Sequence, residues 1–231
     1  MTDSRETEQQ AALRFGPEYR EEVALPGGER LVLRPIRPDD KAKLQSGLRR
    51  LSPKSRYLRF FTAKDHLTDA ELRYLTEVDG HDHFALALGE LDAEGNEGDG
   101  VGTARFVRLE DEPTVAEPAI AVVDPMQGRG LGRLLMLRLI AAAEERGVEK
   151  FRCELLSDNA PVRELLTDVS PGATFHTDGP VTLADMPLPH VEPDHPPEQP
   201  APESVPATWL RLAAERIVEL RHALLARFRR E

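Results

Sequence analysis

The sequence predicts an α/β protein of the α+β kind, in which helices flank a central, twisted, mixed and mostly antiparallel sheet. Two observations predict this class. Segments typical of strands and helices follow one another in the order strands, helices, strands, helix, strand, helix, strands. A glycine-rich turn at 127–133 also joins an apolar run at 119–123 to a leucine-rich helix, as expected for one βαβ crossover.

Short apolar or alternating segments separated by turn residues predict the strands. In order, these are 22–25, 30–35, 83–91, 101–109, 115–123, 151–156 and a weak final hairpin over 174–186, broken at Gly179-Pro180. Pro26-Gly27-Gly28 forms the first turn, and the polar segment 92–100 joins two later strands. We therefore expect one folded domain over residues 21–186.

Capping residues and helical periodicity predict the helices. In order, these are a helix capped by Asp39 or Asp40 and reaching 51, one from Ser52-Pro53 through 61, one capped by Thr68 with Glu71 and ending near 79, one from 130 to about 146, and one from Asn159 to about 167. The helix at 130–146 is apolar on most faces and is followed by Gly147. We expect it to pack against the sheet and to hold the glycine turn rigidly.

The two ends of the chain differ from the middle in composition. Residues 1–20 mix charges with few apolar residues, which predicts a mobile segment. Residues 187–206 hold eight prolines and four acids without Lys or Arg, which predicts an extended linker. Residues 207–231 carry apolar residues at alternating spacings of three and four, with six Arg and three Glu. They predict an amphipathic helix that docks on its own domain, forms a homodimer, or contacts a partner or an anionic membrane.

Charge and cysteine content limit the setting in which the protein works. The net charge of −11 disfavours nonspecific nucleic-acid binding and favours cationic ligands. Cys153 is the one cysteine and lies in a predicted strand, so we expect a buried thiol and a reducing, cytoplasmic location. The sequence contains neither an N-terminal apolar leader nor an apolar run of the ~18 residues that a membrane span needs. We therefore expect no transmembrane segment.

The glycine-rich turn has the composition of a phosphate site. It reads Gln127-Gly128-Arg129-Gly130-Leu131-Gly132-Arg133. Glycine at every second position permits positive φ and exposes backbone N–H groups at a helix N-terminus, where an anion binds well. The residue three after Gly130 is Arg133, so the turn lacks the third glycine of a dinucleotide fingerprint. It also lacks the lysine and hydroxyl of a nucleoside-triphosphate loop.

What remains is the pattern Gln/Arg-x-x-Gly-x-Gly/Ala, which resembles the acyl-CoA pyrophosphate loop of the GCN5-related N-acetyltransferases (GNAT). Similarity to the Pat-like bacterial protein-lysine acetyltransferases extends over about residues 30–168. The segments that carry this similarity are 33–40, 51–61, 83–86, 102–108 and Ala116-Glu117-Pro118-Ala119. The resemblance implies the GNAT fold and acetyl-CoA as co-substrate. A glycine-rich connection without a ligand is the alternative for the turn.

An amine that attacks a thioester directly must first lose a proton. An amine with a pKa of ~10.4 is neutral in about one molecule in 2,500 at pH 7, a handicap of about 4.6 kcal/mol, so a carboxylate base matters. In the Pat-like branch, the glutamate of the Ala-Glu-x-Ala segment is that base, and Glu117 occupies its position here. A solvated glutamate at a strand end is the alternative. Pro118 cannot donate to a sheet ladder and predicts an edge, a strand start or a bulge.

The resemblance implies further roles for three residues. The backbone of Val122 and Val123 would pair with the pantetheine arm, and Asn159 would contact the same arm. As an alternative or additional role, Asn159 can cap its helix. The tyrosine that often protonates the leaving thiolate is missing, because Leu165 and Leu166 occupy its region.

Two polar clusters have simpler explanations. His81-Asp82-His83 lacks a third recognisable set of metal ligands and reads as a polar turn before a strand, so we expect no metal. The acidic cluster at 110–112 reads as a charged loop, although it could help to hold a cationic substrate.

The glycine turn and the resemblance together predict an acyl-CoA-dependent N-acyltransferase that moves acetyl from acetyl-CoA to a primary amine. The resemblance implies a protein lysine as acceptor, and a small cationic amine is the alternative. The competing hypotheses are a noncatalytic acyl-CoA sensor or interaction module with the same fold, and a scaffold that recruits partners through 207–231.

Overall fold

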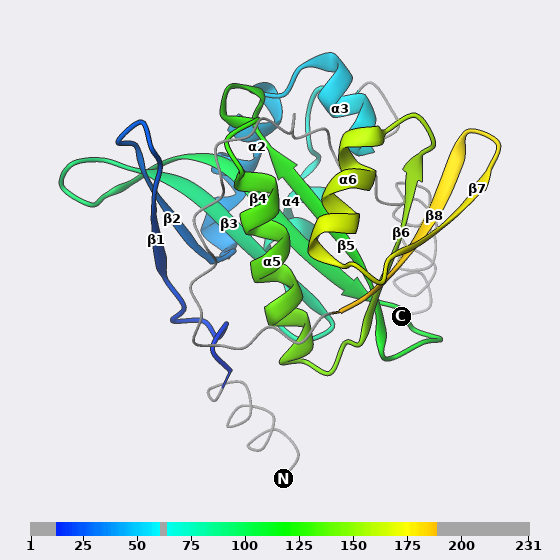
Figure 1. Cartoon of the computed structure of the whole chain (residues 1–231). Helices are drawn as coiled ribbons and strands as arrows, with labels where there is room; N and C mark the ends of the chain where they lie inside the picture. The colour runs from blue at the N-terminus through cyan, green and yellow to red at the C-terminus, as the bar shows by residue number, and fades with distance from the viewer. Residues whose placement is uncertain (1–12, 61–63, 189–231) are drawn as a thin grey trace, which may run out of the picture.

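An eight-stranded mixed sheet organises residues 13–60 and 64–188, the part of the chain that the computed structural model describes (Figure 1). The strand order across the sheet is β1-β2-β3-β4-β5-β6-β8-β7. The strands are β1 (Glu21–Ala24), β2 (Arg30–Pro35), β3 (His83–Leu91), β4 (Glu97–Arg108), β5 (Val115–Val122), β6 (Lys150–Leu156), β7 (Thr174–Asp178) and β8 (Val181–Pro187). Neighbours pair antiparallel except β5 and β6, which are parallel and joined through a helix. The predicted sheet class and single crossover are confirmed.

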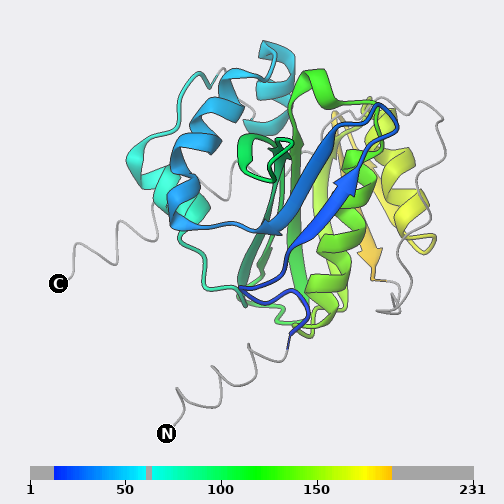
Figure 2. The same ribbon diagram turned by 90° about the vertical axis from the view of Figure 1, so that its left-hand side faces the viewer.

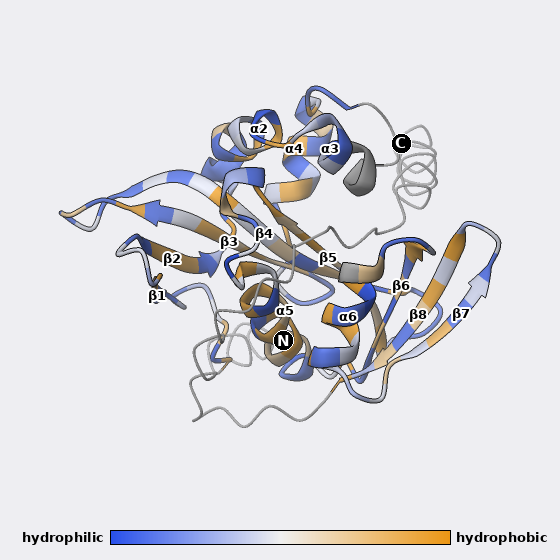
Figure 3. Ribbon diagram, turned by 45° about the horizontal axis from the view of Figure 1, so that its top comes forward, coloured by the Kyte–Doolittle hydropathy of each residue, from blue (hydrophilic) through white to orange (hydrophobic). Residues whose placement is uncertain are grey.

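Helices cover both faces of the sheet (Figure 3). They are α2 (Lys41–Arg49), α3 (Pro53–Phe60), α4 (Asp69–Thr76), α5 (Leu131–Glu144) and α6 (Ala160–Val169), with short 3-10 turns η1 (Pro38–Asp40) and η2 (Asp124–Met126). Helices α2, α3 and α4 lie over one face, and α5 and α6 lie over the other. The capping box predicted for Thr68 and Glu71 forms, but α4 ends at Thr76 instead of 79, because Glu77 leaves helical dihedrals with ψ of 70°.

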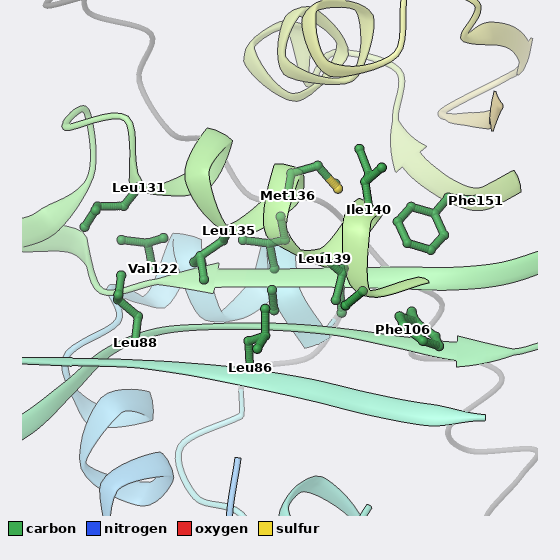
Figure 4. Packing of buried hydrophobic residues seen from close by; sticks show 14 of the residues in the cluster. Leu86, Leu88, Phe106, Val122, Leu131, Leu135, Met136, Leu139, Ile140 and Phe151 are labelled. Atoms are coloured by element: carbon green, nitrogen blue, oxygen red, sulfur yellow. The ribbon is translucent and has the colours of Figure 1, made fainter. Parts of the chain in front are cut away.

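The core lies mainly between α5 and strands β3 to β6 (Figure 4). Leu135, Leu139 and Ile140 are 0% exposed, as expected for a helix that is apolar on most faces. Phe106 lies between Phe84 and Phe151, with ring centroids 5.8 Å and 6.1 Å away respectively. Burial of this apolar surface fixes α5, and therefore its N-terminal end, against the sheet.

Two predicted boundaries of the folded domain are wrong. Phe15 is 1% exposed, and its carbonyl accepts a hydrogen bond of 2.9 Å from Arg146 Nη2, so packing begins before residue 21. The same guanidinium donates to the carbonyls of Gly80 and Ala142, which ties three distant segments together. Pro187, predicted to begin the linker, instead ends β8, and its carbonyl accepts from Ser170.

Strand β4 begins four residues earlier than predicted. The sequence assigned 92–100 to a loop, but Glu97 pairs with Leu91 and Gly100 pairs with Gly89 across two register shifts. A tight turn held by Asp92 and Asn96 brings these residues back to β3. Residues 189–206 of the predicted linker and the predicted helix at 207–231 lie outside the described residues, as do residues 1–12 of the predicted N-terminal segment. Within the described ranges, no helix is long and apolar enough to cross a membrane.

Candidate functional site

The sheet opens between its two parallel strands. Strands β5 and β6 pair only at Val115 with Lys150 and at Ala116 with Phe151, and then diverge (Figure 1). The opening therefore begins beside Glu117 and widens toward the end of β5, where the glycine turn follows.

Pro118 gives a physical reason for this opening. The Val123 N–H donates to Val101 and the Leu109 N–H donates to Val115, so odd-numbered residues of β5 direct their backbone groups to β4. Even-numbered residues, Pro118 included, direct theirs toward β6. Proline has no N–H, so it cannot continue the parallel ladder past Ala116. Pro118 thus lies inside a strand but at a local edge, one of the arrangements that the sequence predicted.

The glycine turn lies at the wide end of the opening. Gly128 and Gly130 have φ of 72° and 78°, which L residues with side chains rarely adopt, and Gly130 is the N-cap of α5. The first N–H groups of a helix have no acceptor within it, so those of Leu131, Gly132 and Arg133 point out of its N-terminal end. Because Leu131 is 2% exposed, this end of the helix is held firmly. The geometry suits an anion such as a diphosphate.

Side chains of the turn contact the protein around it. Gln127 Nε2 donates to the carbonyl of Val122 at 3.1 Å and to Asp124 Oδ1 at 3.2 Å. Arg129 Nη2 lies 2.6 Å from Glu29 Oε1, and Arg133 Nε lies 2.6 Å from Asp168 Oδ2. These contacts brace the turn from the strand, from the first hairpin and from α6.

The two valines at the end of β5 differ in how their backbone is used. The Val123 N–H donates to Val101 and its carbonyl accepts from Met126, both within the protein. Val122 instead directs its N–H to the side of the opening, by the alternation described for Pro118. Of the two predicted pantetheine contacts, Val122 is therefore the better placed.

Glu117 is half-buried at the narrow end of the opening. Its side chain projects to the same face of β5 as Ala119 and Ala121, as the strand period requires. Burial raises the pKa of the neighbouring Cys153 thiol, and the negative charge of Glu117 adds to this increase. The carboxylate therefore acts electrostatically across the opening on β6. The thiol is buried, as predicted.

A pocket lies on the same face, between the sheet and helices α2 and α4, with a cavity volume of about 80 Å³. Its lining is mostly apolar or glycine: Leu44, Gly47, Leu48, Leu51, Leu67, Leu75, Gly100, Val101, Gly102, Ala121 and Val123, with Lys43, Thr103 and Arg105 as polar members. No pattern in the sequence predicts this pocket. The helical spacing of Leu44, Leu48 and Leu51 marks a buried face, but it does not show that the space beneath is incompletely filled.

A buried polar group lies beside the pocket. Arg105 Nη1 lies 3.0 Å from His83 Nε2, and Arg105 Nη2 donates to the carbonyl of Leu75 at 3.1 Å. Burial, with the charge of Arg105, lowers the pKa of His83 to about 3, so the imidazole is neutral at physiological pH. His81 instead contacts Asp82 at the surface. Among the described residues, no group of three His, Cys, Asp or Glu side chains is arranged to hold a metal ion.

Asn159 occupies the N-cap position of α6, but its side chain makes no capping hydrogen bond. Asn159 is 5% exposed, so its side chain is buried at the start of α6. In the same helix Leu166 is 0% exposed and Leu165 packs against the core. The region in which the family resemblance implies a tyrosine is thus filled by closely packed apolar side chains.

The site is thus built on a mixed sheet that opens between two parallel strands, with a glycine turn starting the helix that connects them. The chain belongs to the acetyltransferase (GNAT) family, because residues 52–168 match the sequence model of that family.

The relatives agree with the Pat-like resemblance. The chain is 39% identical over 139 residues to Acetyltransferase Pat of Mycolicibacterium smegmatis, covering 60% of this chain and 40% of that protein. It is 30% identical over 143 residues to Acetyltransferase PA5475 of Pseudomonas aeruginosa, covering 62% of this chain and 75% of that protein. The crystal structure of the GNAT domain of S. lividans PAT superposes with a TM-score of 0.64 at 29% identity, covering 73% of this chain and 97% of that one. The predicted fold and family are confirmed.

Proposed function

We propose that this chain transfers the acetyl group of acetyl-CoA to a primary amine, with Glu117 as the general base. One observation carries the proposal. The glycine turn and Glu117 lie at the two ends of one opening in the sheet, along the unpaired side of β5. From 117 to 123 this strand spans about 20 Å at ~3.3 Å per residue, a length suited to an extended arm.

The turn would bind the pyrophosphate through the N–H groups of residues 128–133. A hydrogen bond to a charged group contributes about 1.5–3 kcal/mol, so a few of them supply a large part of the ~8 kcal/mol of micromolar affinity. The pantetheine arm would continue along the open side of β5, where the Val122 N–H points and Asn159 lies at the start of α6. This arrangement brings the thioester toward Glu117.

The amine acceptor would approach from the face that carries the pocket. Glu117 takes the ammonium proton, directly or through water, and the neutral amine then attacks the thioester carbonyl. The tetrahedral intermediate loses a second proton from nitrogen to water and collapses by breaking the C–S bond, which gives the amide and the CoA thiolate. The apolar pocket would hold the aliphatic stem behind the amine, and a protein lysine or a small cationic amine has such a stem.

The chemistry needs the base more than it needs an acid. The amine handicap is about 4.6 kcal/mol at pH 7, whereas a thiol of pKa ~8.5 leaves as thiolate at a disadvantage of only about 2 kcal/mol. Apolar packing at Leu165 and Leu166 is thus compatible with turnover, with water protonating the thiolate.

Glu117→Gln tests the proposal. We expect kcat/KM for amine acetylation to fall about 10²- to 10⁴-fold, because a positioned base contributes that much. Free-CoA release with a panel of lysine peptides and small amines measures it. Glu94→Gln, an exposed carboxylate in the turn between β3 and β4, is the matched control and should act as wild type. Unchanged turnover in Glu117→Gln would remove Glu117 as base.

A noncatalytic acyl-CoA sensor is the second candidate, favoured by the leucines at 165 and 166 in place of a tyrosine. It predicts tight acetyl-CoA binding by calorimetry without turnover on any amine of the panel. Turnover on one amine would exclude it.

A further inference from the structure

The tip of the first hairpin contacts the glycine turn (Figure 2). Glu29, directly after the Pro26-Gly27-Gly28 turn, pairs with Arg129 although 100 residues separate them. The second guanidinium nitrogen of Arg129, Nη1, lies 3.3 Å from Met126 Sδ. Arg129 itself stands between the two positive-φ glycines whose N–H groups face outward. A carboxylate from another element is thus fixed beside the proposed phosphate site.

The hairpin is shaped around this carboxylate. A Cβ on Gly27 would lie 2.3 Å from Glu29 Oε2, so the carboxylate occupies the space that a side chain at 27 would take. Gly28 has φ of 87°, which turns the chain back so that Glu29 projects toward Arg129. The hydrogen bond from Arg129 lowers the pKa of Glu29 below its usual range, so the carboxylate is charged at neutral pH. Glycine at both positions therefore favours this pairing.

We infer that Glu29 is a positioning residue that competes with the phosphates of acetyl-CoA for Arg129. The inference rests on the proposed function, in which the turn holds the pyrophosphate. Without ligand, Glu29 holds the guanidinium and offsets its charge. When the nucleotide binds, its anionic phosphates attract the guanidinium of Arg129. Because this guanidinium is already paired with Glu29, the new attraction is partly offset by the weakening of the existing ion pair. Glu29 thus weakens CoA binding and speeds release of the product.

The exposure of the Glu29–Arg129 ion pair sets the expected size of its effect on CoA affinity. The side chains of Arg129 and Glu29 are 34% and 44% exposed, so water and salt screen the pair. Screened surface pairs support changes of about two- to fivefold in an equilibrium constant. Because the nitrogen and oxygen atoms of this pair lie only 2.6 Å apart, we expect an effect on CoA affinity within that range.

A double-mutant cycle on the full chain tests the coupling. CoA dissociation constants are measured by calorimetry for Glu29→Gln, Arg129→Gln and the double variant. We expect Glu29→Gln to tighten CoA binding about two- to fivefold at low salt, and less at high salt. In the Arg129→Gln background the same change should have no effect. Equal effects in both backgrounds, or no tightening, would overturn the inference.

Two further variants separate position from charge. Gly27→Ala keeps all charges but displaces the Glu29 carboxylate from Arg129, at low cost because the displaced atom ends a flexible side chain. It should tighten CoA binding in the same direction as Glu29→Gln. Glu22→Gln removes an equally charged, exposed carboxylate that pairs with Arg30 instead, and it should leave CoA affinity unchanged. A Glu22 effect as large as that of Glu29 would mean that only net charge matters.

Gly128→Asp distinguishes this inference from the proposed function. Gly128 is exposed, nothing lies within 4 Å of the added Cβ, and aspartate tolerates positive φ better than most residues. It would place a carboxylate in the turn and should abolish CoA binding. Undiminished CoA binding in this variant would refute the phosphate site itself. Lost binding there, together with no Glu29 coupling, would refute only the role of Glu29.

Discussion

The two faces of β5 are filled in different ways. The even-numbered residues face α5, where Ala116, Ile120 and Val122 are at most 5% exposed and pack with Leu135 and Leu139. The odd-numbered residues face α2 and α4, where Glu117 is half-buried and Ala121 lines a pocket together with the buried Arg105. One face is closely packed, and the other retains space and polar groups. A strand period of two thus lets one segment carry stability on one side and chemistry on the other.

The largest expected effect is on the polar face, in acid. His83 is protonated more readily in the unfolded chain, at a pKa of ~6.5, than in the folded one, at about 3. Stability is therefore full above pH 6.5 and declines as the pH falls toward 3, by about 3 kcal/mol between pH 7 and pH 4. Urea unfolding of wild type and His83→Gln at both pH values measures this loss. The variant should lose about 3 kcal/mol less than wild type over this range, and parallel losses would show that His83 does not contribute.

On the packed face, Leu139→Ala should cost about 3 kcal/mol of unfolding free energy, within the usual 2–5 kcal/mol for a buried leucine. The reason is lost burial plus the cavity left in a closely packed region. The urea midpoint should fall at every pH, and the slope of stability against pH should stay that of wild type. The KM for the amine should equal that of wild type at a temperature where the variant is fully folded. A higher KM there would contradict the separation of the two faces.

The smallest effect is expected from filling the pocket. A Cβ at Gly47 would meet nothing within 4 Å, so Gly47→Leu places its side chain at the pocket lining without a backbone clash. We expect kcat/KM for the acceptor to fall about tenfold, as for a binding loss of about 1.4 kcal/mol, with the KM for acetyl-CoA unchanged. Gly47→Ala is the matched control.

Gly47→Ala should stabilise α2 by about 0.5–1 kcal/mol without loss of activity, because glycine weakens a helix interior. A leucine at 47 that left every acceptor unaffected would exclude this pocket from acceptor binding.

Features fixed by neighbours in the chain were predictable from the sequence. The capping box of Thr68 and Glu71, the positive φ of Gly128 and Gly130, and the break in pairing at Pro118 each follow from the chemistry of one or a few adjacent residues. The glycine turn was therefore found with its helix and its strand. Its side-chain contacts were not, because Glu29 and Asp168 come from segments far away in the sequence.

Features fixed by distant segments needed the structure. Arg146 ties Phe15 and Gly80 to the end of α5, and composition alone assigned Phe15 to a mobile segment. His83, which the sequence placed in a polar turn, is buried against Arg105 and the ring of Tyr74, whose centroid lies 4.8 Å away. Neither environment leaves a periodic signal, because each depends on which segments meet.

By itself, the sequence determined the strand and helix order, the bend that presents N–H groups at the start of α5, and the proline that ends the parallel pairing. These depend on backbone dihedrals and on the presence or absence of a single N–H, which are local properties. Only the tertiary structure decided that the space under α2 and α4 remains open, that Glu117 faces the same side, and that Glu29 reaches Arg129. Those outcomes depend on packing between elements that are distant in the chain, and packing is set by the shapes of all the partners together.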